Sequence, residues 1–217
     1  MSVIYPRLPP RRGSPAATWW GKAWGRSLEE AAYGEAELRR GRQLARAGAV
    51  GAISVEPGRY VAAVRDTFTV TGTVEPFDVT SAELFVEVVA SGAGRVAALL
   101  SGELPAALVE GCEEVGVELV PYAGELGWTC TCEAWLDPCE HGLAVAVQVG
   151  WLMQSDPLVL LHLRGLPREE LLARVHAAAT GTGGAVDSAE EDLATGLDAA
   201  LRAANLIGDA EAGWGPT

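Results

Sequence analysis

Apolar residues recur at spacings of three and four between residues 19 and 33, which predicts a helix with one buried face. These residues are Trp20, Trp24, Leu28 and Ala31. Thr18 stands directly before this segment and can serve as its N-cap. A second helix is predicted from Glu35 to about Ala47, because Gly48 follows it as a stop signal.

Short runs of β-forming residues follow the two helices. They are residues 50–56, 60–65, 68–74 and 84–89. Pro57 and Gly58 separate the first two runs and are typical of a tight turn, so these runs are predicted to form a hairpin. We therefore expect a small antiparallel sheet in this part of the chain.

Helical patterns return in the second half of the chain. They cover residues 94–100, 104–115, 142–153, 157–163 and 168–178. Residues 142–153 are almost wholly apolar, which predicts a helix buried on all sides. The order of elements predicts an α+β fold: an N-terminal helical pair, a small antiparallel sheet and a helical module.

The same patterns divide the chain into five segments. They are a disordered leader (1–17), an N-terminal α+β region (18–121), a cysteine-bearing helical module (122–178), a linker (179–187), and a C-terminal helix with a tail (188–217). The linker is rich in glycine, and Ser188 and Glu191 are placed as the capping box of the last helix.

The net charge of −13 argues against a protein whose whole surface binds phosphate. Residues 1–50 nevertheless hold nine Arg or Lys against four Glu, so the first part of the chain is locally basic. No window reaches the roughly 18 unbroken apolar residues of a membrane span, and the N-terminus lacks the apolar segment of a signal peptide. We expect a cytoplasmic protein without membrane contact.

Three of the four cysteines crowd into one segment with the pattern C-x-C, six residues, C-x-H. The four residues are Cys130, Cys132, Cys139 and His141. In a reducing compartment such clustering indicates a metal rather than disulfides. Three thiolates and one imidazole fill the tetrahedral shell of Zn²⁺ and leave no position for water or substrate, so the sequence predicts a structural zinc site.

The alternative is that these are buried core cysteines and a core histidine, but the neighbouring Asp, Glu and Pro are unlike a core segment. Cys112 is predicted to be a small buried hydrophobe, and His162 and His176 to be ordinary helix residues. No phosphate-binding loop, catalytic triad or metal-plus-base motif can be assembled from the chain. We therefore expect neither an enzyme nor a small-molecule substrate.

The cysteine segment resembles the SWIM zinc finger, and the stretch from Trp19 to about Val175 is similar to bacterial, chiefly actinobacterial, SWIM proteins. The features that carry this resemblance are Trp19-Trp20-Gly21 with Trp24, Arg40-Gly41-Arg42, Ala45-Arg46-Ala47-Gly48, Leu99-Leu100-Ser101-Gly102-Glu103-Leu104-Pro105, the finger itself, Asp156-Pro157 and Leu163-Arg164-Gly165. Proteins of this kind are often associated with Swi/Snf-type helicases, so the resemblance implies such a protein partner.

Two positions of the finger depart from the family pattern. Cys-Pro-Asp is replaced by Cys132-Glu133-Ala134, and Cys-Lys-His is replaced by Cys139-Glu140-His141. The zinc ligands are intact, but two carboxylates now stand beside the thiolates and should repel a nucleic-acid backbone.

Two functions fit these observations. In the first, the protein is an adaptor that docks on a helicase-type ATPase or another DNA-processing partner and contacts nucleic acid through arginines of the second helix, which are Arg39, Arg40, Arg42 and Arg46. These arginines could instead solvate the helix and pair with Glu35 and Glu37. In the second, the protein is a pure interaction scaffold whose acidic surface and C-terminal helix recruit a basic protein.

Overall fold

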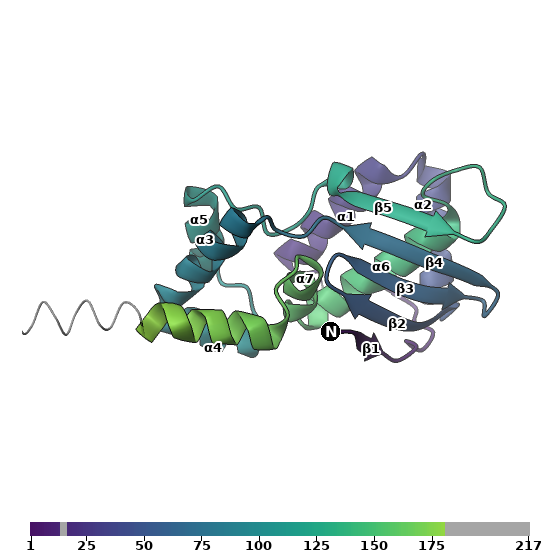
Figure 1. Cartoon of the computed structure of the whole chain (residues 1–217). Helices are drawn as coiled ribbons and strands as arrows, with labels where there is room; N and C mark the ends of the chain where they lie inside the picture. The colour runs from purple at the N-terminus through teal and green to yellow at the C-terminus, as the bar shows by residue number, and fades with distance from the viewer. Residues whose placement is uncertain (14–16, 181–217) are drawn as a thin grey trace, which may run out of the picture. The chain divides into compact units, whose positions relative to one another are not determined.

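Five antiparallel strands form one sheet in the residues that this computed structural model describes, which are 1–13 and 17–180 (Figure 1). The strands are β1 (Val3–Tyr5), β2 (Val50–Glu56), β3 (Arg59–Val64), β4 (Phe68–Val74) and β5 (Leu126–Cys130). They lie in chain order, so each strand pairs with the next one. The predicted hairpin is present between β2 and β3: Glu56 lies opposite Arg59, and Gly58 adopts φ 77° in the turn. The α+β class predicted from the sequence is confirmed.

The sheet has one apolar face and one polar face, because successive side chains of a strand point to opposite sides. Tyr60, Val70, Val74 and Trp128 are among the buried residues of the apolar face. Threonines at alternate positions line the polar face, namely Thr69, Thr71, Thr73 and Thr129. The apolar face needs a cover, and one helix supplies it.

Helix α6 (Glu140–Ser155) packs across the apolar face of the sheet and lies behind it in Figure 1. Two further helices, α1 (Trp19–Ala31) and α2 (Glu35–Arg46), also pack on α6, which is therefore buried along almost its whole length. A Cβ atom at Gly41 of α2 would lie only 2.7 Å from the Leu143 Cβ. Glycine at position 41 therefore permits this close approach of α2 to α6.

Two tryptophans of α1 fix that helix on α6. The indole N–H of Trp24 donates to the Ala146 carbonyl at 2.9 Å, and the indole N–H of Trp20 donates to the Met153 carbonyl at 2.8 Å. Both rings are buried, whereas Trp19 is 38% exposed. Of the three tryptophans in this helix, two therefore belong to the core.

A helical insertion separates β4 from β5. It consists of α3 (Val79–Ala90), α4 (Ala93–Leu100), α5 (Ala106–Glu114) and the short 3₁₀ helix η1 (Ala123–Glu125). Arg164, after α7 (Leu158–Leu163), joins both ends of this insertion: its guanidinium donates to the Glu75 carbonyl at 2.6 Å and to the Glu125 carboxylate at 2.8 Å. Arg164 is buried, so this ion pair is shielded from solvent. Residues 168–175 form a further helix.

Residues 84–89, expected to be a strand, are part of helix α3, so that prediction was wrong. The Asp78 carboxylate caps the helix by accepting the Ser81 N–H at 2.7 Å. Ala82, Phe85 and Val89 then fall on one buried face at helical spacing. A short valine-rich run has the composition of a strand, and a run of six residues is too short for its periodicity to distinguish a strand from a helix.

Two of the expected segment boundaries also differ from the structure. The leader was expected to be disordered, but Val3–Tyr5 pairs with β2 and forms the edge of the sheet. The division near residue 121 is not found, because β5 completes the same sheet, and the chain divides instead into Met1–Val175 and His176–Thr217. The expected linker, apart from its first two residues, and the C-terminal helix lie outside the described residues.

Within the described residues, no helix is long and apolar enough to cross a membrane.

Gly72 of β4 lies opposite Tyr60 of β3, and a Cβ at Gly72 would lie 2.0 Å from the ring carbon Cζ of Tyr60. The Tyr60 ring is fully buried and its hydroxyl accepts the Trp128 indole N–H at 2.9 Å, so it cannot move aside. We expect Gly72→Ala to lower the free energy of unfolding by about 3 kcal/mol. Urea unfolding followed by circular dichroism measures this change.

Gly25→Ala is the matched control, because a Cβ at Gly25 of α1 meets no atom within 4 Å. Replacing a helical glycine by alanine should raise the unfolding free energy by about 0.5–1 kcal/mol. An unchanged urea midpoint for Gly72→Ala would contradict this account of the contact between β3 and β4.

Candidate metal centre

The first two cysteines of the cluster stand at the end of β5. Cys130 is the last residue of this strand and lies opposite Val70 of β4. The ladder continues for one more residue, because the Thr131 N–H donates to the Thr69 carbonyl at 3.0 Å and the Thr69 N–H donates to the Thr131 hydroxyl at 2.9 Å. These two hydrogen bonds fix the chain between Cys130 and Cys132.

The other two members of the cluster stand at the start of α6. Cys139 is the N-cap of this helix, and its sulfur accepts the Gly142 N–H at 3.5 Å. His141 lies in the first helical turn. The positive end of the helix dipole therefore faces the cluster and favours a negatively charged thiolate.

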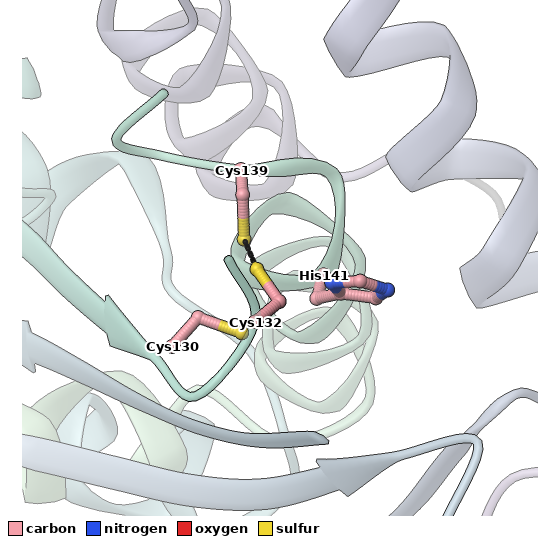
Figure 2. A group of neighbouring side chains, drawn as sticks. All are labelled: Cys130, Cys132, Cys139 and His141. Carbon is pink, nitrogen blue, oxygen red and sulfur yellow. Dashed lines mark hydrogen bonds between the residues drawn. The ribbon is translucent and has the colours of Figure 1, made fainter. Parts of the chain in front are cut away.

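The three cysteine sulfurs lie close together and the His141 ring lies beside them, as Figure 2 shows. The sulfur atoms and a ring nitrogen of His141 all lie within 4.8 Å of one another, and the Cys132 and Cys139 sulfurs are 3.6 Å apart. In a tetrahedral zinc site with three sulfurs and one nitrogen the ligand atoms are separated by about 3.5–3.8 Å, given Zn–S and Zn–N distances of about 2.3 and 2.0 Å. Small side-chain rotations would bring the set to this geometry.

The His141 ring shows directly that these residues suit a metal. Both ring nitrogens are buried and have no hydrogen-bond partner in the described chain, an arrangement that is costly unless something binds them. The ring lies against Phe68 of β4, with centroids 4.4 Å apart. Burial lowers the pKa of His141, although the neighbouring Glu140 raises it, so the imidazole is held in the neutral form that ligates metals.

Burial also controls the three thiols. It raises the pKa of Cys130 to about 12 and also raises that of Cys139. The pKa of Cys132 is lowered: burial opposes ionisation, but hydrogen bonds from the Ala134 backbone and from the other two cysteines favour the thiolate. Without a cation the cluster therefore retains protons that a divalent metal would displace on binding.

The glutamate at position 140 is balanced by a cation of α2. The Arg40 guanidinium lies 3.9 Å from the Glu140 carboxylate and 3.7 Å from that of Glu37. Glu133, the other acidic residue of the finger, is exposed and has no ion-pair partner in the described part of the chain. The two carboxylates that depart from the family pattern therefore have different surroundings.

The four arginines predicted to contact phosphate are not equivalent. Arg40 is engaged as described, and Arg42 donates to the Glu29 carboxylate at 2.7 Å. Arg39 and Arg46 are exposed and form no ion pair with any described residue. The structure thus divides this set into two paired and two unpaired side chains.

The remaining cysteine and two histidines lie apart from the cluster. Cys112 is buried in α5, and burial raises its pKa to about 11, as expected for a core thiol. His162 lies with Nε2 3.0 Å from the Met1 carbonyl oxygen, and His176 falls in the second unit of the chain. Phe68 and Thr69 of β4, which contact the finger, could not be identified from the sequence, because their distance along the chain leaves no local signal.

Comparisons with known proteins agree with this geometry. Residues 113–150 match the SWIM zinc finger family. The chain is 33% identical over 186 residues to an uncharacterized protein of Mycobacterium tuberculosis, and the match covers 83% of this chain and 67% of that protein. No solved structure matches the chain. The cofactor expected from the sequence, Zn²⁺, is therefore supported by both the family match and the ligand set.

The purified, reduced protein should contain one zinc ion per chain, measured by elemental analysis. Cys139→Ser should weaken zinc binding by at least about 100-fold, because it removes one of four ligands. Chelation of the zinc should also lower the thermal midpoint, since the binding free energy of a structural zinc is folding free energy.

Cys112→Ala is the control for loss of a thiol and should keep full zinc content, because Cys112 lies in the core of the helical insertion. Equal zinc loss in both variants, or wild-type protein without bound metal, would show that the cluster is not a zinc site.

Proposed function

The chain belongs to the SWIM zinc finger family, and on this basis we propose that it is a non-enzymatic adaptor of the cytoplasm that docks on another protein of DNA metabolism. The partner class that the resemblance favours is a helicase-type ATPase. The observation that carries the proposal is the closed ligand set: four protein side chains fill the coordination shell of zinc. Such a site orders the chain around it and leaves its surface for recognition.

A catalytic role for the zinc is disfavoured by the same ligand set. Zinc enzymes keep one coordination position open for water or substrate, which the metal activates. Here three thiolates and one imidazole take all four positions. Glu133 and Glu140 would then have no metal-bound water to deprotonate, so we assign them no catalytic role.

The distribution of charge favours a protein partner over nucleic acid. Between Val96 and Leu163 the sequence has ten acidic residues and no arginine or lysine. This stretch includes β5, the finger and α6, so the segments that carry the zinc ligands contribute acidic but no basic side chains, and Arg40 of α2 offsets one of them, Glu140. Phosphate backbones are repelled by such a surface, whereas basic proteins are attracted to it.

An affinity-tagged full chain, purified from its native cells and analysed by mass spectrometry, tests this proposal. We expect enrichment of a helicase-type ATPase or another DNA-processing protein. The zinc-free variant Cys139→Ser should lose that partner, because the finger loses its fixed shape. Recovery of the same proteins with Cys139→Ser, or of no DNA-processing protein at all, would contradict the adaptor role.

A second candidate function, direct contact with nucleic acid, is favoured by one feature of the leader. The backbone N–H of Arg11 donates to the Arg46 carbonyl at 2.9 Å, which brings the chain at Arg11 and Arg12 close to Arg46 at the end of α2. Together with Arg39 these side chains would supply cations for phosphate on the helical side of the molecule.

The paired and unpaired arginines provide the test of this second function. Arg39→Ala with Arg46→Ala should reduce by about two the slope of log affinity against log salt for duplex DNA, because two phosphate contacts are lost. Arg40→Ala with Arg42→Ala should leave the slope unchanged, since these side chains are engaged by carboxylates. Fluorescence anisotropy measures the salt dependence of both double variants. If the wild-type protein has no affinity for duplex DNA at low salt, the nucleic-acid function is wrong and only a protein-binding function remains.

A further inference from the structure

Two of the most exposed aromatic side chains of the described chain touch each other. Trp135 lies in the loop between Cys132 and Cys139 and is 82% exposed, and Tyr33 lies in the turn between α1 and α2 and is 73% exposed. Their ring centroids are 5.9 Å apart with an interplanar angle of 69°, which is an edge-to-face contact. In Figure 1 the loop that carries Trp135 extends beyond the end of the sheet.

Exposure of this pair is energetically unfavourable in the isolated chain. A tryptophan ring would release more water by burial than any other side chain of this loop, yet most of its surface remains in solvent. Tryptophan and tyrosine are enriched among the residues that dominate protein interfaces. The pair therefore has the properties of an anchor that a partner covers.

Acidic residues flank both rings in the sequence. Glu133 and Asp137 stand two residues before and after Trp135, and Glu30 and Glu35 stand on either side of Tyr33. All four are exposed, and none forms an ion pair with a described residue. Of the arginines of α2, Arg40 and Arg42 are engaged by other carboxylates, whereas Arg39, the first arginine after Tyr33, forms no ion pair with a described residue.

The zinc site controls the position of one of the two rings. Cys132 and Cys139 are the ligands at the two ends of the loop that carries Trp135. The loop has no helix or strand of its own. The Thr131–Thr69 hydrogen bonds and the start of α6 hold its two ends, and a zinc ion bound by both sulfurs would join these ends to each other. Zinc would thereby hold Trp135 against Tyr33.

We propose that Tyr33 and Trp135, together with Glu30, Glu35, Glu133 and Asp137, form a docking site for an arginine-bearing segment of a protein partner. This inference rests on the adaptor function proposed above and names the surface that performs it. An arginine guanidinium stacks on an aromatic face and at the same time donates paired hydrogen bonds to carboxylates. The six side chains supply both kinds of contact.

Nucleic acid is the occupant that the same aromatic pair would otherwise suggest. Bases stack on exposed tryptophan and tyrosine rings with little dependence on sequence. Each stacked nucleotide also brings a phosphate, however, and four uncompensated carboxylates would repel it. The charge of the site therefore favours a basic protein segment.

Binding of a fluorescent peptide of about ten residues with alternating arginine and serine, measured by anisotropy on the zinc-loaded full chain, tests the inference. Trp135→Ala should weaken binding by at least about tenfold, as for the loss of an interface anchor. Glu133→Gln with Asp137→Asn should weaken it by a similar factor at low salt, because two attractive charges are removed.

Two matched controls separate this site from the general acidity of the protein. Tyr122→Ala removes an exposed aromatic ring from the acidic stretch, and Glu103→Gln with Glu110→Gln removes the same charge elsewhere. Both control variants should bind the peptide with an affinity within about twofold of wild type, as is usual for surface substitutions. Trp135→Ala should retain its zinc, which shows that the finger remains folded.

Three results would overturn the inference. The first is that wild-type protein does not bind the peptide, and the second is that Trp135→Ala binds it as tightly as wild type does. The third is that wild-type protein binds an oligothymidine more tightly than the peptide and that Trp135→Ala loses this binding. The last result would assign the site to nucleic acid.

Partner capture distinguishes the two proposals. If Trp135→Ala captures the DNA-processing partner as well as wild type does, the adaptor function stands and this site is wrong. If the peptide result holds but no such partner is found, the site stands without that function.

Discussion

The four zinc ligands belong to only two short segments, the end of β5 and the first turn of α6. Ligation therefore holds the last strand of the sheet against the start of the helix that covers the sheet. Helix α6 also contacts more elements than any other helix, because α1, α2 and four of the five strands of the sheet pack on it. The ring nitrogens of His141 have no hydrogen-bond partner among the described residues, which favours a metal ion as the group that completes this arrangement.

The surface around this centre differs from that of the helical pair. On the finger side the carboxylates are uncompensated, apart from Glu140 beside Arg40 and Glu125 beside Arg164. On the helical side, α2 carries arginines of which half are neutralised by glutamates. A closed metal site surrounded by acidic groups and an exposed aromatic pair is suited to recognition of a basic protein, since both charge and apolar surface would be complementary.

Much of the local structure follows from the sequence because its causes are local. The spacing of Trp20, Trp24 and Leu28 gives α1, and Pro57-Gly58 gives the hairpin turn. An almost wholly apolar run identified the central helix, whose polar backbone is satisfied internally while its side chains face other elements all round. Residues 84–89 were assigned wrongly, because six residues rich in valine suit either a strand or a buried helix until their neighbours are known.

The sequence by itself determined the zinc ligands, since ligand type and spacing within one short segment are enough to specify a tetrahedral site. Only the tertiary structure decided which groups meet across long chain separations. It placed Val3–Tyr5 on the sheet, paired Arg40 with Glu140, and brought Trp135 against Tyr33. The first contact arises from pairing of β1 with β2, and the other two arise from the packing of α1, α2 and the finger around α6. No local pattern of residues encodes such long-range packing.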